Sequence, residues 1–492
     1  MHKSDMNAET TPMASFFDAA EILAVLQGFN PWWTGRPAPN PAFRRLAFHA
    51  CRRHIAHAEL RRAILLSGPR RVGKTTVLQQ LAADAIASGR EARSVLYLSL
   101  DHPLLKLVTL REILTLYAER VHPEGSPALL LLDEVQYTRD WELEIKLLVD
   151  HRPELRIVAT GSAAVVQKNE LAESGVGRWI TVSVPTLSYF EFVHLRGEAV
   201  PEIDSKLKPT QLFQRGAVSR EDLLARLRPL LPLFHRYLLV GGFPETAKLD
   251  DTSLCHRLLR EDVVERVLKR DMTTLFGVRN IADLERLFIY LCLHTGGILA
   301  HKTVADALGT TTATVANHLE LLEQANLVYR LAPVRTGGKQ VLKARNKYYL
   351  VDAALRNAVL LRSEEVLSRP DEMGLVVETT VLRHFHAYTY RDRPEFVYWR
   401  DPVTEKEVDL IVRSPAYTIP IEVKYRENAE LDPRGGLVHF CSKERVAQAF
   451  LVTKREADFE EVRLDGVETR FLRVPAHVLC YLLGQAERTS WE

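Results

Sequence analysis

The stretch Ala63-Ile-Leu-Leu-Ser-Gly-Pro-Arg-Arg-Val-Gly-Lys-Thr-Thr76 decides the fold class of this chain. It opens with an apolar run typical of a buried strand, passes through a loop that contains two glycines, and ends where a helical pattern starts. The loop fits G-x-x-x-x-G-K-[ST], a phosphate-binding pattern, in the strand–loop–helix context that this pattern requires. The sequence therefore predicts an α/β domain that binds a nucleoside triphosphate.

Each part of this loop has an expected contact with the nucleotide. Gly68 and Gly73 let the backbone pass close to the phosphates, and the amides at the start of the following helix stabilise the anion. Lys74 is expected to reach the β- and γ-phosphates, and Thr75 to bind Mg²⁺. The predicted ATP-binding residues of the loop are Gly68, Pro69, Arg70, Arg71, Val72, Gly73, Lys74, Thr75 and Thr76.

A second, acidic pattern supports this interpretation. Leu129-Leu-Leu-Leu-Asp-Glu134 is an apolar strand that ends in two carboxylates. Asp133 is predicted to hold magnesium-bound water, and Glu134 to polarise the water that attacks the γ-phosphate. The alternative is a pair of acids in a solvated turn, which the upstream loop disfavours. The predicted reaction is therefore ATP hydrolysis, with ATP and Mg²⁺ as the cofactors.

Two further positions are candidates for sensing or neutralising phosphate charge. The next strand-like run ends in hydroxyls, and Thr160 or Ser162 is a candidate γ-phosphate sensor, with a plain turn as the alternative. Arg178 is a candidate arginine finger that acts in cis or on a neighbouring subunit, with a surface arginine as the alternative. A finger that acts on a neighbour would require a homo-oligomer.

The order of the elements predicts three structured regions. Short apolar strands alternate with helical patterns up to about residue 191, which predicts a parallel sheet covered on both faces. Helical spacing follows, and strands return after Val334. The predicted division is an N-terminal extension at 1–27, a P-loop ATPase domain at 28–195, a linker with a helical and winged-helix region at 196–345, a second α/β domain at 346–480 and a tail at 481–492.

Six segments, taken in order, resemble those of one family: GPRRVGKTT, LLLLDEVQYTRDWE, ATGSAA, GVGRW, VPTLSYFEF and LLVGGFPE. They are similar to segments of prokaryotic AAA-type ATPases that carry a C-terminal restriction-endonuclease-like domain, and Asn30-Pro31-Trp32-Trp33 also resembles theirs. The resemblance runs from about residue 28 to about residue 475. It implies a P-loop ATPase joined to a nuclease-like domain, in a family most of whose members have no assigned role.

The last predicted domain carries a PD-(D/E)xK pattern, in which Asp409 is followed by Glu422-Val-Lys424. Asp409 and Glu422 are predicted to end neighbouring strands and to bind Mg²⁺, with Glu378 as a third acid from the preceding helix. Period-two alternation puts Lys424 on the same face as Glu422, where its ammonium can orient the attacking water. The alternative is a charged strand pair on a solvated face.

A helix-turn-helix rhythm at residues 301–322, followed by two strand-like runs, predicts a winged helix. The second helix also carries Glu320 and Glu323, so a lid or an oligomer contact is the alternative to DNA binding. Five cations in the wing are candidates to contact DNA phosphates: Arg335, Lys339, Lys343, Arg345 and Lys347.

Composition limits the class of protein. The chain has 492 residues, of which 46% are hydrophobic and 26% are charged, and its net charge is only +2. A nucleic-acid surface would therefore have to be a local patch. Five scattered cysteines without a C-x-x-C pair indicate neither a zinc site nor a disulfide framework. We recognise no secretory signal and no membrane-spanning run, so we expect a cytoplasmic protein that does not bind membranes.

The sequence as a whole favours an ATP-hydrolysing and DNA-processing protein with a metal-dependent, nuclease-like C-terminal domain. The alternative is an ATP-gated switch or scaffold whose nuclease-like domain is catalytically silent and binds a partner.

Overall fold

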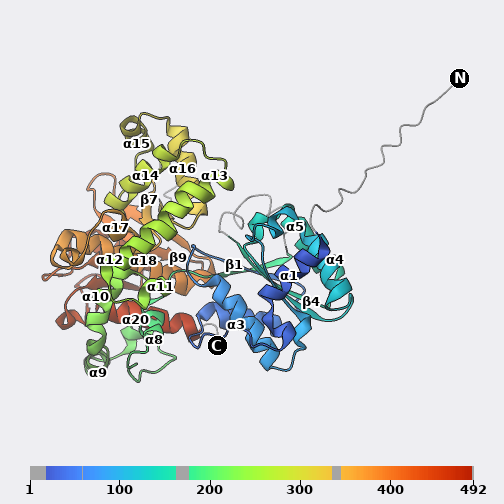
Figure 1. Ribbon diagram of the computed structural model, residues 1–492. Helices are drawn as coiled ribbons and strands as arrows, with labels where there is room; N and C mark the ends of the chain where they lie inside the picture. Colours follow the sequence, from blue (N-terminus) through green and yellow to red (C-terminus); the bar gives the residue numbers. More distant parts are fainter. Residues whose placement is uncertain (1–17, 58, 162–176, 335–344, 490–492) are drawn as a thin grey trace.

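The computed structural model describes residues 18–57, 59–161, 177–334 and 345–489. A five-stranded and an eight-stranded sheet organise the described chain. Figure 1 shows them in two lobes. The first lobe holds β1 and β4 with α1, α3, α4 and α5, and the second holds the helices from α8 onward with the C-terminal strands.

The five-stranded sheet has the order β2-β3-β4-β1-β5, and every neighbouring pair in it is parallel. Because β1, β4 and β3 are parallel, the loop after β1 and the acids that end β3 lie at the same carboxyl edge, with β4 between them. The predicted parallel sheet is confirmed. Its strands are β1 (Ala63–Ser67), β2 (Val95–Ser99), β3 (Ala128–Asp133), β4 (Leu155–Gly161) and β5 (Trp179–Ser183).

The helices of the first lobe cover this sheet. A capping box between Thr109 and Glu112 starts α4. Part of the predicted N-terminal extension belongs to the lobe, because Ile22 and Leu26 of α1 are buried in the same core as β2 and α4. The helices are α1 (Ala19–Phe29), α2 (Leu46–Ala56), α3 (Lys74–Ala87), α4 (Leu110–Arg120) and α5 (Trp141–His151).

The Asn-Pro-Trp-Trp segment covers the exposed edge of the parallel sheet at β2. The side chain of Asn30 accepts from the backbone N–H of Tyr97 at 2.7 Å and donates to its carbonyl at 2.9 Å. The indole N–H groups of Trp32 and Trp33 both donate to the carbonyl of Val95 at 3.0 Å. Side chains therefore satisfy backbone groups that an edge strand otherwise leaves open.

The second lobe begins with helices that lead to a long continuous helix. Its central part, η7 (Leu259–Asp271), is a π-helix, a form that is rare and frequent at functional sites. The elements are α8 (Tyr189–Leu195), α9 (Ala217–Leu227), α10 (Leu231–Val240), α11 (Pro244–Ala247), α12 (Thr252–Leu258), η7 and α13 (Met272–Thr274).

Three helices and an antiparallel strand pair follow. Thr311 caps the N-terminus of α16, and Gly309 ends α15 with a φ of 67°, a conformation that favours glycine. Helices α15 and α16 lie where the sequence predicts a helix-turn-helix. The elements are α14 (Ile281–Leu293), α15 (His301–Leu308), α16 (Thr312–Gln324), β6 (Val328–Pro333) and β7 (Lys347–Leu350).

The mixed sheet has the order β12-β13-β11-β10-β9-β8-β6-β7. Strand β6 pairs with β8 through Ala332 and Pro333, so this sheet continues across the predicted boundary between 345 and 346. Its C-terminal elements are α17 (Ala353–Val359), α18 (Pro370–Thr389), β8 (Glu395–Arg400), β9 (Glu407–Arg413), β10 (Thr418–Lys424), α19 (Gly436–Glu444), β11 (Gln448–Thr453), β12 (Glu460–Val462), β13 (Arg470–Pro475) and α20 (Ala476–Thr489).

Two segments predicted to be peripheral belong to the core of the second lobe. Leu482 and Leu483, in the predicted tail, are fully buried on α20, which packs against α18 and α8. Leu212 and Phe213, in the predicted linker, join the same core. Polar neighbours such as Gln485 and Glu487 hide the contribution of α20 in the sequence, although both of these side chains are themselves buried.

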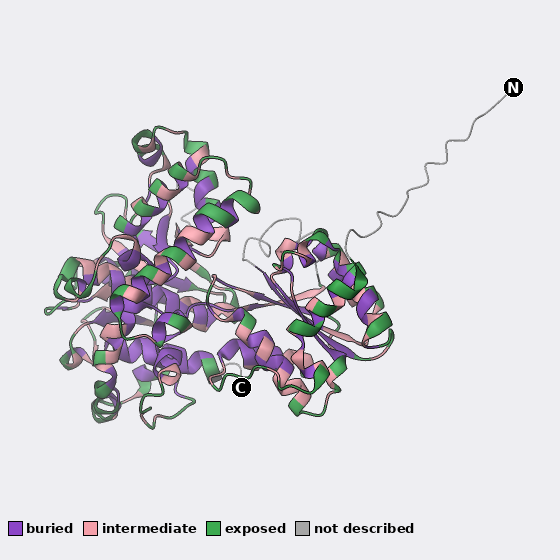
Figure 2. Cartoon of the chain, in the orientation of Figure 1, coloured by how far each residue is buried: buried purple, intermediate pink, exposed green. Residues whose placement is uncertain are grey.

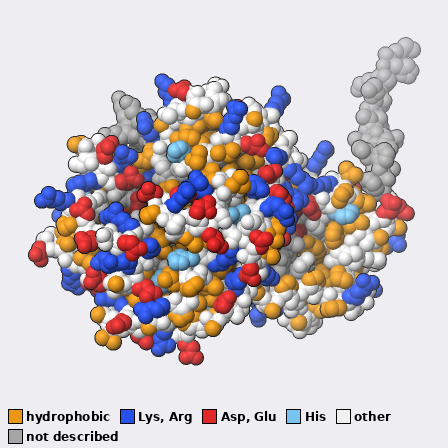
Figure 3. All heavy atoms as spheres, turned by 60° about the vertical axis from the view of Figure 1, so that its left-hand side comes forward, with side chains coloured by type: hydrophobic (Ala, Val, Ile, Leu, Met, Phe, Trp, Pro, Cys, Tyr) orange, Lys and Arg blue, Asp and Glu red, His pale blue; other side chains and the backbone are white. Residues whose placement is uncertain are grey.

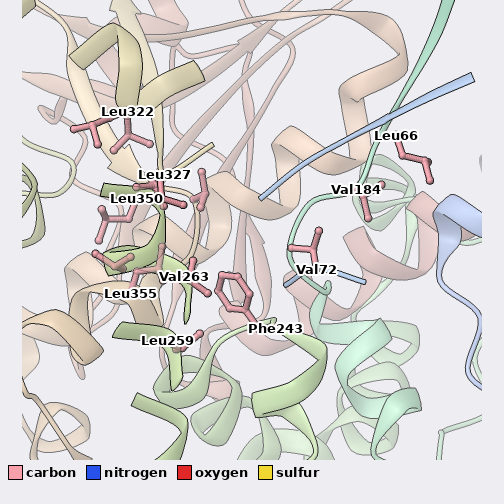
Figure 4. Close-up of a cluster of buried hydrophobic side chains, with 14 of the residues drawn as sticks. Leu66, Val72, Val184, Phe243, Leu259, Val263, Leu322, Leu327, Leu350 and Leu355 are labelled. Atoms are coloured by element: carbon pink, nitrogen blue, oxygen red, sulfur yellow. The ribbon is translucent and has the colours of Figure 1, made fainter. Parts of the chain in front are cut away.

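The two lobes share a hydrophobic core. Figure 2 shows buried residues through the strands of both lobes. Figure 4 shows Phe243 between Val72 of the phosphate loop and Leu259 and Val263 of η7, all within one buried cluster. The five cysteines are buried and unpaired. Across the described helices, none is both long enough and apolar enough to cross a bilayer.

We expect Leu482→Ala to lower the free energy of unfolding by about 2–5 kcal/mol, because it leaves a cavity in this core. The matched control is Leu143→Ala on α5, where the side chain is 53% exposed and the change should stay within about 0.5 kcal/mol. Urea denaturation of both variants measures the difference. Equal stabilities would show that residues 481–489 are a tail after all.

Candidate functional site

The phosphate loop connects β1 to α3 in a geometry that its two glycines permit. The N–H of Val184 donates to the carbonyl of Ser67 at 2.7 Å, and a Cβ on Gly68 would overlap the Val184 backbone. Gly73 has a φ of 91°, which disfavours any residue with a side chain. Gly68 is thus needed for close packing against Val184, the residue after β5, in addition to its expected approach to phosphate.

Lys74 is the first residue of α3, and its side chain folds over the loop. Its ammonium donates to the carbonyls of Gly68 at 2.9 Å and Pro69 at 2.8 Å. Burial lowers the pKa of Lys74, while the charges of Glu134 and Asp133 act in the opposite direction. A phosphate group is a stronger acceptor than a carbonyl, so the ammonium is positioned to transfer to an incoming triphosphate.

Asp133 accepts hydrogen bonds from three hydroxyls on three elements. Thr75 donates at 2.7 Å, Tyr97 at 3.1 Å, and Thr160 donates to the other carboxylate oxygen. Burial and then the Glu134 charge raise the pKa of Asp133, whereas the hydroxyls lower it. The Thr75 hydroxyl and the Asp133 carboxylate face each other beside the loop, so their oxygens fit a Mg²⁺ ion that accompanies a nucleotide.

Glu134 follows β3 in a left-handed conformation, with φ 56° and ψ 49°. Its N–H donates to Thr160 at 2.9 Å, and Gln136 donates to its carboxylate. Strain of this kind is typical of residues held for a function. Thr160 therefore contacts Asp133 and Glu134 directly, and its sensing of the γ-phosphate stays a prediction. Ser162 lies outside the described residues.

The second lobe closes over the phosphate loop through an ion pair that the sequence does not reveal. Arg70 donates to both carboxylate oxygens of Asp271, at 2.5 and 2.6 Å, and to the Tyr137 hydroxyl at 2.9 Å. Arg71 pairs with Asp262 at 3.0 Å on the same π-helix, but in a more exposed position. A small cavity at this junction is lined by Gly68, Arg70, Lys74, Glu134, Val267, Asp271, Phe276 and Ala325.

Arg45 binds the phosphate loop through the carbonyl of Val72. Its guanidinium forms a buried pair with Glu191 at 2.8 Å and donates to the carbonyls of Val72 at 2.7 Å and Pro185 at 2.8 Å. The sequence patterns assign Arg45 no role. No spacing rule could pair it with Glu191, because 145 residues lie between the two positions.

Arg178 does not lie near the phosphate loop of its own chain. It precedes β5, whose Trp179 pairs with Ala63 at the start of β1, and the loop follows the other end of β1. Its guanidinium forms an ion pair with Asp150 at 3.1 Å. A finger acting in cis is thus not supported by this arrangement, and a contact with a neighbouring subunit stays a prediction.

The predicted nuclease-like residues do come together at the second sheet. Glu378 lies on α18, Asp409 on β9, and Glu422 and Lys424 on β10. The Lys424 ammonium pairs with Glu422 at 2.9 Å. Burial and then the Asp409 charge raise the pKa of Glu378 to about 8, and burial also raises the pKa of Asp409.

Lys347 is not a DNA contact of the wing. Its side chain is only 2% exposed, forms an ion pair with Glu407, and lies 3.9 Å from Asp409. Burial lowers the pKa of Lys347, but the charges of Glu378, Asp409 and Glu407 outweigh it, so the pKa is raised and the ammonium persists. Lys347, Glu407, Asp409, Glu378, Glu422 and Lys424, with Tyr349, are called the acidic cluster below.

The other four predicted DNA contacts are the remaining cations between β6 and β7. Arg345 is exposed, and its carbonyl accepts from the Tyr398 hydroxyl at 2.6 Å. Arg335, Lys339 and Lys343 lie outside the described residues. Among the described wing residues, Arg345 is therefore the predicted cation that a DNA phosphate could reach.

The acidic cluster does not fit a divalent cation in this arrangement. In the described part of the chain, no three His, Cys, Asp or Glu side chains are grouped so that they could hold a metal. Of the predicted ligands, Asp409 lies 3.9 Å from the Lys347 ammonium, and Glu422 is paired with Lys424. The predicted metal set is thus brought together without the geometry that a metal would need.

Comparisons with protein families match three segments of the chain. Residues 60–193 match a family described as an AAA domain. Residues 231–366 match a domain of unknown function (DUF8612), and residues 373–470 match another (DUF4143). The AAA match and the parallel P-loop sheet together make the first lobe an ATPase-like AAA domain.

Relatives share most of the chain at low identity. An uncharacterized protein of Haemophilus influenzae is 22% identical over 415 residues, which cover 83% of this chain and 92% of the relative. One from Mycobacterium tuberculosis is 26% identical, covering 77% of this chain and 75% of the relative. One from Methanocaldococcus jannaschii is 25% identical, covering 58% of this chain and 60% of the relative.

Solved structures match this chain only at low TM-scores. The Thermotoga maritima RuvB Holliday junction branch migration motor has a TM-score of 0.26 and 16% identity, over 60% of this chain and 91% of that one. AMPPCP-bound DnaA from Aquifex aeolicus has a TM-score of 0.24 and 16% identity, over 58% of this chain and 89% of that one.

We expect the Arg70–Asp271 pair to couple the two lobes energetically. A double-mutant cycle with Arg70→Ala and Asp271→Ala should give a coupling energy of about 1–3 kcal/mol, because the pair is bidentate and largely buried. The matched cycle with Arg71→Ala and Asp262→Ala should give less than about 1 kcal/mol, because that pair is exposed. Chemical denaturation without nucleotide measures both cycles, and equal couplings would contradict a closure specific to Asp271.

Proposed function

We propose that this chain binds ATP between the phosphate loop and the end of β3, and hydrolyses it. One observation carries the proposal: Lys74, Thr75, Asp133 and Glu134, predicted from two separate patterns, converge at one edge of the sheet. Thr75 and Asp133 are in direct contact at 2.7 Å. This is the arrangement that phosphoryl transfer needs, with a cation for the phosphates, oxygen ligands for a metal and a carboxylate for water.

Each side chain has a distinct task in this proposal. Lys74 binds the β- and γ-phosphates after it leaves the carbonyls of Gly68 and Pro69. Thr75 and Asp133 would hold Mg²⁺, which neutralises charge on the phosphates when it is bound. Glu134, oriented by Gln136, accepts the proton of the attacking water at its carboxylate oxygen.

The contact between the lobes would make the second lobe sensitive to nucleotide. Arg70 belongs to the phosphate loop, yet its partner Asp271 ends η7 of the second lobe. A triphosphate beside Arg70 offers a competing anion. Nucleotide binding would therefore weaken or reorient the Arg70–Asp271 pair. Because Asp271 ends η7, this change would be transmitted from the loop to the position of η7.

For the second lobe we propose a restriction-endonuclease-like domain. Its support is the order α18–β8–β9–β10–α19–β11, in which β8, β9 and β10 are antiparallel neighbours and β11 is parallel to β10. Asp409 lies on the central β9 and Glu422 with Lys424 on β10, as the PD-(D/E)xK pattern requires. This proposal concerns the fold of the domain and does not require that it cleaves DNA.

Between DNA cleavage and a catalytically silent domain, the described contacts favour the silent domain. Lys347, predicted to contact DNA phosphates, is instead buried beside Glu407 and Asp409. Figure 3 shows cationic and anionic side chains interspersed over one face of the molecule. The best-supported function is therefore an ATPase that acts as a nucleotide-responsive switch or scaffold, with its C-terminal domain used for binding.

We expect Lys74→Ala and Glu134→Gln each to lower the ATPase kcat by about 100-fold or more, because each removes a group that acts on the transferred phosphoryl or on water. Glu134→Gln should still bind ATP, since the phosphate contacts of the loop remain. Lys206→Ala, at an exposed position away from the loop, is the control. Wild-type turnover in the Lys74 variant would refute the assignment.

We expect the wild-type protein not to cleave DNA. The assay uses labelled linear, circular and single-stranded DNA with Mg²⁺ or Mn²⁺, with and without ATP. An Asp409→Ala variant distinguishes cleavage by this cluster from a contaminating nuclease. Cleavage that disappears in this variant would establish an ATP-linked nuclease in place of the silent domain.

A further inference from the structure

We propose that the ammonium of Lys347 is the resident cation of the acidic cluster, in the place where a nuclease would hold a divalent metal. The proposal rests on the nuclease-like fold proposed above and specifies which cation occupies that site and keeps a divalent metal out. Lys347 is the cluster's internal counter-ion, so the carboxylates stay together without a metal.

The position of the ammonium supports this role. Its nitrogen forms an ion pair with Glu407 and lies 3.9 Å from Oδ1 of Asp409. The nitrogen lies 5.3 Å from the centre of the Tyr398 ring, and only 2% of the side chain is exposed. A buried lysine of this kind is stable only when anions surround it.

The backbone of β7 holds this lysine in place. Lys347 is the first residue of β7, pairs with Leu331 of β6, and forms an antiparallel bridge with Ile298 on its other side. Both neighbours belong to the segment that precedes the nuclease-like core in the chain. The ammonium is therefore delivered to the cluster by β7, which precedes α18 in the chain but belongs to the same mixed sheet as β9 and β10.

The predicted metal ligands already have donors. Oδ2 of Asp409 accepts from the N–H of Val423 at 3.0 Å, and its Oδ1 faces Lys347. Oε1 of Glu378 accepts from the Tyr349 hydroxyl at 2.5 Å.

The remaining predicted ligand, Glu422, is also engaged. Its Oε1 accepts from the Lys424 ammonium at 2.9 Å. A divalent cation would have to displace these donors and approach a buried ammonium, which like-charge repulsion opposes. The cluster should therefore exclude divalent metals for as long as Lys347 occupies it.

Metal binding tests this directly, because it is independent of ATP turnover and of DNA cleavage. We would titrate Mn²⁺ into nucleotide-free protein by calorimetry, using wild type, Asp409→Asn, Lys347→Met and the double variant. Wild type and Asp409→Asn should give the same titration. Lys347→Met keeps the length of the side chain but removes its charge. This variant should gain one Asp409-dependent Mn²⁺ site, with an affinity about tenfold or more above any Mn²⁺ binding by the wild type.

The comparison of wild type with Asp409→Asn decides the matter even if Lys347→Met does not fold. Asp409-dependent Mn²⁺ binding by the wild type would overturn the proposal. A folded Lys347→Met protein without the new site would overturn it as well. Lys347→Arg, which retains a cation, should resemble the wild type. Loss of ATPase activity would not change any of these outcomes, so failure of the ATPase proposal is seen separately.

Discussion

The buried ion pair between Arg45 and Glu191 is the interaction on which the rest of the structure depends. Arg45 precedes β1, Glu191 lies on α8, and the same guanidinium holds the carbonyls of Val72 and Pro185. It thus joins the phosphate loop, the exit of β5 and the first helix of the second lobe. A charge buried this deeply is tolerated only with a full set of partners, so all four groups are constrained together.

That constraint makes the ATPase-like site a product of both lobes. The loop is packed from one side by Arg45, and from the other by η7 through Arg70 and Asp271. Phe243 and Val72 belong to one hydrophobic cluster, which continues into helices α15 and α16. Because no solvent layer separates the lobes at this point, a change at the phosphates must be accommodated by the second lobe. Nucleotide dependence of the C-terminal domain is the physical consequence we infer.

The two places where the sequence predicts a metal ion surround their buried carboxylates with different groups. Asp133 is surrounded by neutral hydroxyls from Thr75, Tyr97 and Thr160, which leave its negative charge available to a cation. Asp409 lies 3.9 Å from the ammonium of Lys347, which already supplies a positive charge. Similar residue types therefore support a metal at one site and oppose it at the other.

Patterns along the chain determined the parallel sheet, the phosphate loop, the acids that end β3 and the positions of Asp409, Glu422 and Lys424. Each of these rests on local spacing, whose period is set by strand or helix geometry over a few residues. Tertiary structure alone decided that Arg45 meets Glu191, that Arg70 meets Asp271, and that residues 481–487, with their polar Gln485 and Glu487, lie buried on a helix. It also decided that Lys347 faces inward. A lysine on a wing strand has the same local pattern whether it meets DNA or a carboxylate, because its neighbours come from β9 and α18, far away in the sequence.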